Sequence, residues 1–472
     1  MNNGINTFNQ LQQEHIIQLQ NIIGAAYVMQ EKDDLHAYSH DETEDLVYYP
    51  AAVVKPRMAE EVAAILVLAQ KAHIPVTPMG ARTGLSGGAL PVCGGIALSM
   101  ERFNSIIEID ERNLQVTVEP GVITQTLQDT LAEKGLFYPP DPASKGSCFI
   151  GGNVAENSGG PKAVKYGVVK DYVLNLEVVM ADGSIIWTGA NVLKNATGYN
   201  LTQLIVGSEG TLGVVTKIVL RLLPLPAMDK LLLIPFSNAV NACAAVSAVF
   251  RAGIIPSAME FMEKSAFDLV LRYEEDLRIQ YDPEAEAFLF VEVDGNNETL
   301  LMEDCTTIAA LVETFGAGEI MMAESAAEKA TLWSIRRKAG EAVKRYSAYK
   351  EEDTVVPRAS LPNLLKKVKE IGSRFGFESY CYGHAGDGNL HVNIVKGTLS
   401  EEAWNEHLPV AIRELFQEVV RLGGTISAEH GIGLVQKGYM DIAFNEIQLD
   451  LFRKIKKVFD PTGILNPGKI ID

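Results

Sequence analysis

The pattern of apolar and polar residues predicts short buried strands and helices over the first half of the chain. Val62, Ile65 and Ala69 recur at helical spacing and place a helix over 58–72. The predicted strands are 51–54, 74–79, 96–100, 105–109 and 115–119, and a further helix covers 123–134. The first 45 residues predict one amphipathic helix followed by a polar connection.

The composition changes past Pro224 and Pro226, and we place a domain boundary near 224–230. Apolar runs predict strands at 231–235, 288–294 and 319–322, and helical patterns cover 239–252 and 298–315. This order predicts an antiparallel sheet with helices on one side.

Polar side chains gather in the segment GHAGDGNLHVN (383–393), where a glycine-rich loop runs into a strand. The alternation places His391 and Asn393 on one face of that strand and Val392 on the other. The segment SAEHGIG follows about forty residues later and holds Glu429 beside His430.

A helical stripe formed by Leu332, Ile335, Ala339, Ala342, Val343 and Tyr346 sets the environment of one arginine. Arg336 lies beside this apolar stripe, whereas Arg337 and Lys338 turn toward water. A guanidinium in that position needs an anion, which is either a substrate carboxylate or a neighbouring acidic side chain.

Composition and charge exclude several classes of protein. The chain has 472 residues, 47% of them hydrophobic, and a net charge of −19, which argues against a nucleic-acid surface. Five scattered cysteines without CxxC spacing argue against a disulfide scaffold or a cysteine-ligated cluster. No signal peptide is evident, and the most apolar run, 218–236, is interrupted by charges and prolines, so we expect a cytoplasmic protein.

Three glycine-rich loops in the first half favour one extended ligand held by backbone N–H groups. They are GARTGLSGGA, CFIGGNVAENSGG and VGSEGTLGVVT. A single loop of this kind is more typical of a simple turn between strands. The chain lacks both the Walker loop and the GxGxxG fingerprint after a strand, so the sequence does not indicate a nicotinamide cofactor.

The order of these motifs, with PPDPASKGSCFIGGNVAENSGG, KNATGYNLTQLIVGSEGTLGVVT and the terminal FDPTGILNPGKI, resembles the vanillyl-alcohol oxidase and p-cresol methylhydroxylase superfamily of FAD-linked oxidases. Within it the chain is most similar to the branch of glycolate oxidase, D-lactate dehydrogenase and D-2-hydroxyglutarate dehydrogenase. The resemblance implies an α+β fold with a two-subdomain FAD-binding domain over 1–225 (core about 50–225). An antiparallel-sheet cap follows over 226–425, and 426–472 returns to the FAD domain.

The resemblance also implies how FAD is bound. The pyrophosphate would lie on the loop from Gly80 to Gly88, and Ala89 replaces the histidine to which some relatives attach FAD, so we expect a non-covalent cofactor. The implied cofactor contacts are Pro78, Gly80, Ala81, Arg82, Thr83, Gly84, Leu85, Ser86, Gly87, Gly88, Pro140, Asp141, Ser144, Ser147, Gly151, Gly152, Asn153, Asn157, Ser158, Gly159, Gly210, Gly213, Val214 and Asn466.

For the chemistry, the resemblance implies that Arg336 binds the substrate carboxylate and that His430 is the catalytic base. His384, His391 and Glu429 match the ligands of the metal-dependent members and would hold zinc, manganese or iron. Asn393 is a candidate substrate or flavin contact, and Asp387 a candidate for orienting a histidine. For the histidines and asparagines the alternative is a hydrogen-bonded loop residue.

Two positions favour a short substrate. Members that bind a dicarboxylate carry a hydroxyl residue and a lysine where this chain has Gly340 and Glu351, so D-lactate or glycolate is favoured over D-2-hydroxyglutarate. Alternatives are a flavin-carrying electron-relay subunit and a non-redox flavin enzyme like alkylglycerone-phosphate synthase. We expect a homo-oligomer. The electron acceptor is oxygen, a quinone, an electron-transfer flavoprotein or an iron–sulfur partner subunit, and the sequence does not choose among these. Through a partner the protein could lie at the membrane periphery.

Overall fold

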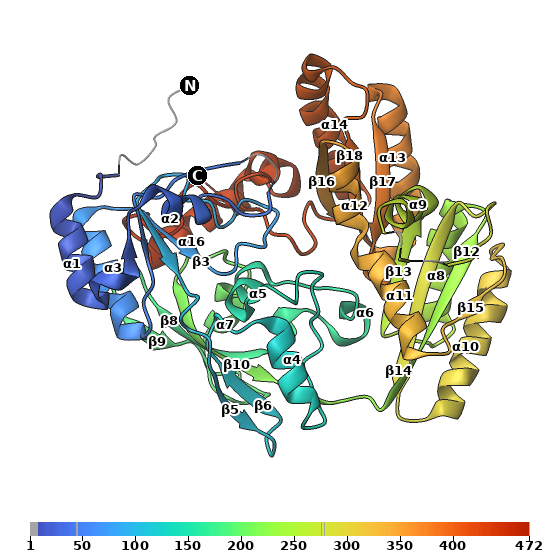
Figure 1. Ribbon diagram of the computed structural model, residues 1–472, viewed down its shortest axis with the longest axis horizontal. Helices are drawn as coiled ribbons and strands as arrows, with labels where there is room; N and C mark the ends of the chain where they lie inside the picture. The colour runs from blue at the N-terminus through green and yellow to red at the C-terminus, as the bar shows by residue number, and fades with distance from the viewer. Residues whose placement is uncertain (1–7, 44–45, 275, 278, 472) are drawn as a thin grey trace. The chain divides into compact units, whose positions relative to one another are not determined.

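The computed structural model describes residues 8–43, 46–274, 276–277 and 279–471 (Figure 1). Residues 1–7 of the predicted amino-terminal segment and residue 472 of the predicted return lie outside these ranges. The chain divides into two compact units: unit 1 comprises 1–158, 168–225 and 429–472, and unit 2 comprises 159–167 and 226–428. No helix within the described ranges combines the length and apolar character that a membrane crossing requires.

The first sheet of unit 1 has the order β1-β2-β4-β3 and is parallel except for β1. Its strands are β1 (Val28–Met29), β2 (Ala52–Val54), β3 (Val76–Met79) and β4 (Ile96–Ser99), and α1 (Gln13–Ile23) and α3 (Ala59–Ala72) pack into the same core. The polar connection predicted after α1 is wrong, because it contains η1 (Ala25–Tyr27), β1 and α2 (Lys32–Ala37). These elements are too short to show a periodicity, and β1 is defined by its pairing with β2.

The second sheet of unit 1 is antiparallel, in the order β5-β6-β10-β8-β9. Its strands are β5 (Ile106–Asp110), β6 (Gln115–Val118), β8 (Val173–Val179), β9 (Ile185–Trp187) and β10 (Val214–Arg221). Other elements are α4 (Thr124–Ala132), α5 (Ile150–Glu156), η2 (Val169–Asp171), α7 (Leu201–Ile205) and the paired β7 (Leu136–Phe137) and β11 (Leu223–Pro224). The strands predicted from 96 to 119 and the helix after them are confirmed within two residues.

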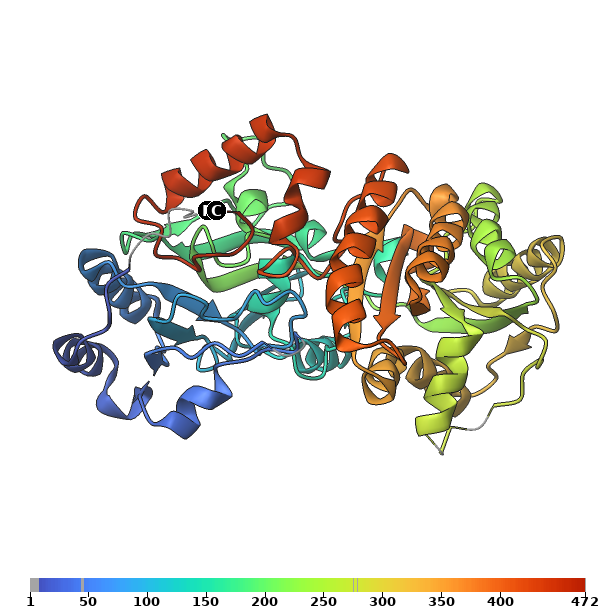
Figure 2. The same cartoon turned by 90° about the horizontal axis from the view of Figure 1, so that it is seen from above.

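The carboxy-terminal segment belongs to the same unit as the amino-terminal strands, as its red ribbon shows beside the blue one (Figure 2). It contains η5 (Lys437–Tyr439), α15 (Met440–Ala443) and α16 (Glu446–Phe459). The chain then pairs with β3, where Val76 N donates to Ile464 O and Asn466 N donates to Val76 O, both at 2.8 Å. Buried Asp460 closes this turn by accepting from Leu465 N at 2.7 Å.

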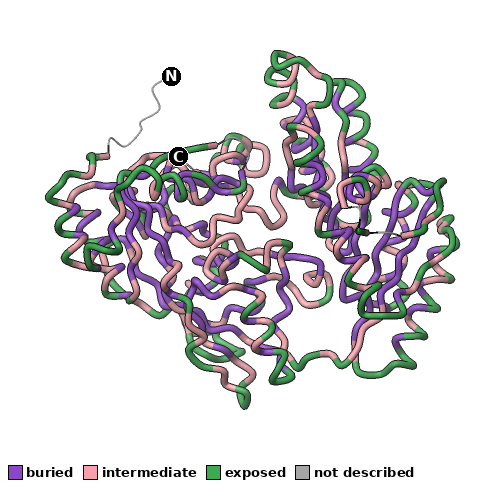
Figure 3. The backbone as a smooth tube through the Cα atoms, in the orientation of Figure 1, coloured by how far each residue is buried: buried purple, intermediate pink, exposed green. Residues whose placement is uncertain are grey.

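Unit 2 is built on a seven-stranded antiparallel sheet of order β15-β12-β14-β13-β17-β18-β16. Its strands are β12 (Met228–Phe236), β13 (Ala258–Glu263), β14 (Ala287–Gly295), β15 (Met321–Met322), β16 (Tyr349–Val355), β17 (Glu378–Gly383) and β18 (Asn389–Val395). Every residue of β13 and β18 is buried, as the purple tube shows for the central strands (Figure 3).

Helices cover both faces of this sheet, so the prediction of helices on one side is wrong. One face, with Leu231, Leu233 and Phe288, shares a core with α9 (Lys264–Tyr273), α11 (Ala326–Arg337) and α12 (Ala339–Tyr346). The intervening residues Leu232 and Ile234 are equally buried. The second helix group consists of α8 (Ala239–Arg251), α10 (Glu298–Glu313), α13 (Leu361–Phe375) and α14 (Glu401–Arg421). Burial on both faces removes the alternation that would distinguish them.

The predicted helical stripe from Leu332 to Tyr346 is interrupted at Lys338, which separates α11 from α12. Five of its six apolar residues are buried, but Tyr346 is exposed. Lys338 does not turn into open water either, because its ammonium pairs with Glu274. Short elements complete unit 2: α6 (Ala163–Tyr166), η3 (Arg358–Ser360) and η4 (Ala385–Asp387).

Candidate functional site

Unit 1 contains a cavity of about 250 Å³ between its glycine-rich loops. Predicted cofactor residues that line it are Pro78, Gly80, Ala81, Arg82, Thr83, Gly84, Leu85, Gly88, Ser144, Gly151, Gly152, Asn153, Ser158, Gly210, Gly213 and Val214. Those that do not are Ser86, Gly87, Pro140, Asp141, Ser147, Asn157, Gly159 and Asn466. Ala89, Glu429 and His430 are also on the lining.

The glycines of this cavity do two different things. A Cβ on Gly84 or Gly152 would meet no atom within 4 Å, so these residues leave space at the cavity wall. A Cβ on Gly151 would lie 2.4 Å from Pro120 Cβ, so that glycine lets two backbone segments pack closely. An extended ligand such as a dinucleotide therefore fits the loops through their main chain.

Two acidic residues on the cavity wall, Glu156 and Glu209, escaped the sequence predictions. Buried Glu209 accepts from Ile432 N and Gly433 N, one bond to each carboxylate oxygen and both at 2.7 Å. A Cβ on Gly431 would lie 2.1 Å from Glu156 Oε2 and 2.9 Å from Glu209 Oε1, so both carboxyl groups approach this turn. Acidic residues inside otherwise glycine-rich motifs were the signal that could have identified them.

The pKa values of both carboxyl groups are raised. Burial, Glu209 and Asp41 raise the pKa of Glu156 well above its usual value. Burial also raises the pKa of Glu209 to about 7, although the Ile432 and Gly433 amides and Lys469 oppose the shift. Oε2 of Glu156 is shielded from solvent and has no hydrogen-bond partner among the described residues. One proton on the pair relieves the repulsion between them.

Asn466 lies beside this pair, but its contacts in the structure are internal. Its Nδ2 donates to Gly88 O at 2.9 Å and to Glu209 O at 2.7 Å. Lys469, also missed from the sequence, is buried and donates from Nζ to Leu90 O at 2.5 Å. Burial lowers the pKa of Lys469 to about 8. Asn466 thus ties the first glycine loop to the loop of Glu209.

In unit 2 the structure brings His384 and His391 together at one end of β17 and β18. Their ring centroids are 5.5 Å apart, and the rings are nearly perpendicular. Both side chains are buried. Two glycines of the segment allow this turn. A Cβ on Gly383 would lie 2.5 Å from Asn389 O. Gly388 has φ 81°, and a Cβ on it would lie 1.9 Å from Val356 O.

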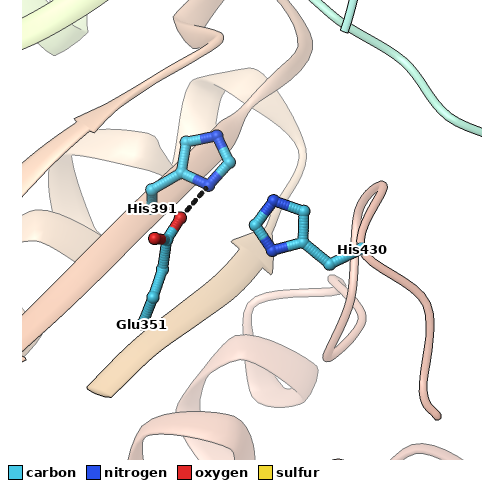
Figure 4. Close-up of side chains that lie close together, drawn as sticks. All are labelled: Glu351, His391 and His430. Carbon is cyan, nitrogen blue, oxygen red and sulfur yellow. Dashed lines mark ion pairs between the residues drawn. The ribbon is translucent and has the colours of Figure 1, made fainter. Parts of the chain in front are cut away.

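Each of these histidines has a carboxylate at Nδ1. Both oxygens of Glu260 lie 2.8 Å from His384 Nδ1, and Glu351 Oε1 lies 3.1 Å from His391 Nδ1 (Figure 4). The third side chain of Figure 4, His430, belongs to unit 1. A histidine that ligates a metal usually donates its other ring nitrogen to a carboxylate or carbonyl. The hydrogen bond to Glu260 therefore fits a metal-binding Nε2 on His384, and at His391 the Glu351 carboxylate lies at ion-pair distance from Nδ1.

Arg336 contacts a neighbouring acid, as one of the two sequence interpretations requires. Its Nη2 lies 2.7 Å from Oε2 of fully buried Glu260, and its guanidinium lies 5.0 Å from the centre of the Tyr382 ring. The contact with Glu260 is an ion pair without hydrogen-bond geometry, because Nε and Nη2 both lack an acceptor within the described chain. Arg336 therefore retains donors for a second anion.

Glu260 was also missed by the sequence predictions. Burial disfavours its charge, but His384 and Arg336 outweigh burial and hold the pKa of this carboxyl below its usual value. Asn393, on the same strand as His391, is fully buried, and neither its Nδ2 nor its Oδ1 has a geometric hydrogen bond within the part of the chain that is described. Asp387 ends η4, and its backbone N–H donates to His384 O at 3.0 Å.

The chain leaves unit 2 beside the same strands. Ala428 N donates to Asp353 Oδ2 at 2.8 Å, and Asp353 on β16 is paired with His391 on β18. Glu429 and His430 are the next two residues in the sequence and belong to unit 1. They are also the residues that line the cavity of unit 1.

Comparisons with known proteins confirm the resemblance drawn from the motifs. The family model for the FAD binding domain matches residues 50–189. The family model for the C-terminal domain of FAD linked oxidases matches residues 225–470. The chain is 39% identical to the glycolate oxidase subunit GlcD of Bacillus subtilis, over 92% of this chain and 91% of that protein. It is 37% identical to the D-lactate dehydrogenase of Anaerostipes hadrus, over 92% of each.

More distant similarities agree with these. The D-2-hydroxyglutarate dehydrogenase of Stutzerimonas stutzeri is 32% identical over 96% of this chain and 98% of that protein. Among solved structures, p-cresol methylhydroxylase superposes with a TM-score of 0.79 at 17% identity, covering 97% of this chain and 96% of that one. This likeness confirms the predicted fold.

Proposed function

Since the chain belongs to the family of FAD linked oxidases and is an FAD-dependent oxidoreductase, we propose that it oxidises a short D-2-hydroxy acid, D-lactate or glycolate, to the 2-oxo acid. The glycine-rich loops that line the cavity of unit 1 would hold FAD non-covalently, and the cofactor would supply the oxidant, with N5 as the acceptor of the hydride from C2. Relatives whose names specify glycolate or D-lactate as substrate support this class of reaction.

The observation that carries the proposal is the pair His384 and His391, each with a carboxylate at Nδ1. We propose that their Nε2 atoms and the carboxylate of Glu429 hold a divalent ion, zinc, manganese or iron. Such an ion would act as a Lewis acid on the substrate hydroxyl. The glycines of the loop serve this role by allowing the two rings to converge.

Three further residues receive roles in the reaction. Arg336 binds the C1 carboxylate through its unused donors, and Asn393 donates to or accepts from the substrate. His430 takes the hydroxyl proton, because a neutral imidazole can act as a base near neutral pH. Its position one residue after Glu429 places the base next to the proposed ligand.

Glu351 supports a short substrate. Its carboxylate lies beside His391, at 3.1 Å from Nδ1, and brings negative charge to the position where a dicarboxylate would need a cation. Gly340 offers no side-chain donor, and a Cβ there would lie 3.1 Å from the Tyr382 hydroxyl. D-2-Hydroxyglutarate remains the second candidate because a relative of that name covers nearly the whole chain.

We further propose that electrons leave through an electron-transfer flavoprotein or an iron–sulfur partner subunit of a cytoplasmic complex. The word subunit in the names of two relatives supports a partner. A pure electron-relay role would need none of Arg336, His384, His391, Glu429 and His430.

The test is anaerobic reduction of the bound flavin, which is measured as the loss of its visible absorbance. We expect D-lactate or glycolate to bleach the flavin and D-2-hydroxyglutarate to do so more slowly. The variant His430→Ala should slow bleaching by about 10²–10⁴-fold, the usual contribution of a general base. His407→Ala, an exposed histidine of α14, is the matched control and should bleach at the wild-type rate.

A flavin that no 2-hydroxy acid reduces would refute the proposed oxidation. The metal is tested separately, by treating the enzyme with a chelator and then adding Zn²⁺, Mn²⁺ or Fe²⁺. We expect chelation to abolish bleaching and one ion to restore it. Full activity after complete metal removal would refute the ligand roles of His384, His391 and Glu429.

A further inference from the structure

Glu260 is a buried carboxylate that connects two predicted site residues from different elements. It lies on β13 with no solvent exposure. The antiparallel register pairs Phe261 with Gly383, so Glu260 stands opposite His384, 124 residues away in the chain. Its oxygens contact His384 Nδ1 at 2.8 Å, and Oε2 contacts Arg336 Nη2 at 2.7 Å.

These contacts determine which atoms of the two partners remain available. With Nδ1 of His384 hydrogen-bonded to a carboxylate, the proposed metal-binding atom of this ring is Nε2. The ion pair between Glu260 Oε2 and Arg336 Nη2 holds the guanidinium in one orientation. The N–H groups on Nε and Nη2 still have no hydrogen-bond acceptor within the described residues. The ring of Tyr382, next to Gly383 on β17, lies 5.0 Å from the guanidinium carbon and limits its movement on another side.

We infer that Glu260 is a positioning residue that sets the spacing between the metal ligand His384 and the carboxylate-binding Arg336. The inference rests on the proposed function, because it uses the roles assigned there to these two residues. A structural ion pair alone would stabilise the sheet without affecting ligand binding. The two roles make different predictions for metal affinity.

The experiment compares Glu260→Gln with the wild type, both as FAD-loaded full chains depleted of metal. Mn²⁺ is titrated and followed by electron paramagnetic resonance, with Zn²⁺ as a competitor. We expect Mn²⁺ affinity to fall about 10–100-fold, as happens when the carboxylate partner of a ligating histidine is removed. With Mn²⁺ saturating, KM for the hydroxy acid should rise more than kcat falls, because the orientation of Arg336 acts on binding.

Glu263→Gln is the matched control on the same strand. Glu263 is also a buried carboxylate with an ion pair, at 2.8 Å from Lys369 Nζ, but it serves α13 rather than the histidines. Its variant should retain wild-type Mn²⁺ affinity and KM. Glu260→Asp keeps the charge one methylene further back, so its affinity should fall between those of the wild type and Glu260→Gln.

Wild-type Mn²⁺ affinity and KM in Glu260→Gln would overturn the inference, as would an equal loss in Glu263→Gln. If Glu260→Gln does not fold, Glu260→Asp decides by the same criterion, and unchanged affinity there is equally contrary. A wild type that binds no Mn²⁺ or Zn²⁺ would also overturn it. The oxidation itself is judged by flavin bleaching, which needs no Glu260 variant, so the two failures are distinguishable.

Discussion

Unit 1 and unit 2 each hold a candidate part of the site around one buried glutamate, and the two glutamates differ in their partners. Glu209 in unit 1 accepts from two backbone amides and faces another carboxyl group, Glu156. Glu260 in unit 2 faces His384 and Arg336. Burial disfavours charge on both, yet the pKa of Glu209 rises whereas that of Glu260 falls. The partners therefore decide the ionisation state where burial is similar.

This difference bears on what each glutamate can do. Glu260 is a permanent anion that can orient cationic and metal-binding side chains. Glu209 exchanges a proton near neutral pH and fixes a backbone turn directly after His430. The first role depends on charge and the second mainly on hydrogen-bond geometry, so substitutions should separate them.

The largest expected effect comes from Glu260→Ala. Removing this anion leaves Arg336 and His384 buried without their partner, which typically destabilises by about 3–5 kcal/mol. Glu209→Ala should cost less, about 1–3 kcal/mol, because it leaves neutral amides without an acceptor. Urea unfolding of both variants measures the difference, and a larger loss in Glu209→Ala would contradict the comparison.

A smaller effect is expected from Gly431→Ala. Gly431 has φ 79°, which is strained for alanine, and an added Cβ would lie 2.1 Å from Glu156 Oε2, so the turn or the carboxyl groups must move. Backbone strain of this kind costs about 1–3 kcal/mol, and we expect weaker FAD binding as well. Flavin release during urea titration measures both.

Gly438→Ala is the matched control for this substitution. A Cβ at Gly438 meets nothing within 4 Å, and its φ is not positive, so stability and FAD affinity should stay unchanged. Equal behaviour of the two alanine variants would show that the turn after His430 is not constrained by the carboxyl pair.

The smallest expected effect is a change in pH dependence. The pKa of Glu209 in the folded state, about 7, lies above its unfolded value near 4.5, so the folded protein keeps a proton that the unfolded chain has lost. The proton on Glu209 should therefore make the free energy of unfolding fall as pH rises from about 4.5 to about 7, by at most about 1.4 kcal/mol per pH unit. Glu156, whose pKa is also raised, adds to this fall.

Glu209→Gln should reduce this slope, because it removes one of the two carboxyl groups that titrate with raised pKa values. Glu260→Gln should leave the slope as it is, since the lowered pKa keeps Glu260 ionised in the folded state throughout that window. Urea unfolding at about pH 5, about pH 6 and about pH 7 measures the slopes. A wild-type slope in Glu209→Gln would contradict the assignment.

The sequence by itself determined the features that depend on neighbours along the chain. Helical and strand periodicities located α3, α4, β12 and β14. The glycine-rich loops, with GHAGDGNLHVN and SAEHGIG, indicated the family of FAD-linked oxidases and drew attention to His384 and His391. These signals are local, because a periodicity or a tight turn is encoded within a few residues.

Only the tertiary structure decided the partners of those residues. β13 and β16 carry Glu260, Glu351 and Asp353, and their charges hide the apolar pattern of a buried strand. Such charges are tolerated inside because the sheet register brings His384 opposite Glu260 and His391 opposite Asp353. Glu260 meets His384 across 124 residues of chain, and no local pattern encodes a pairing of that span.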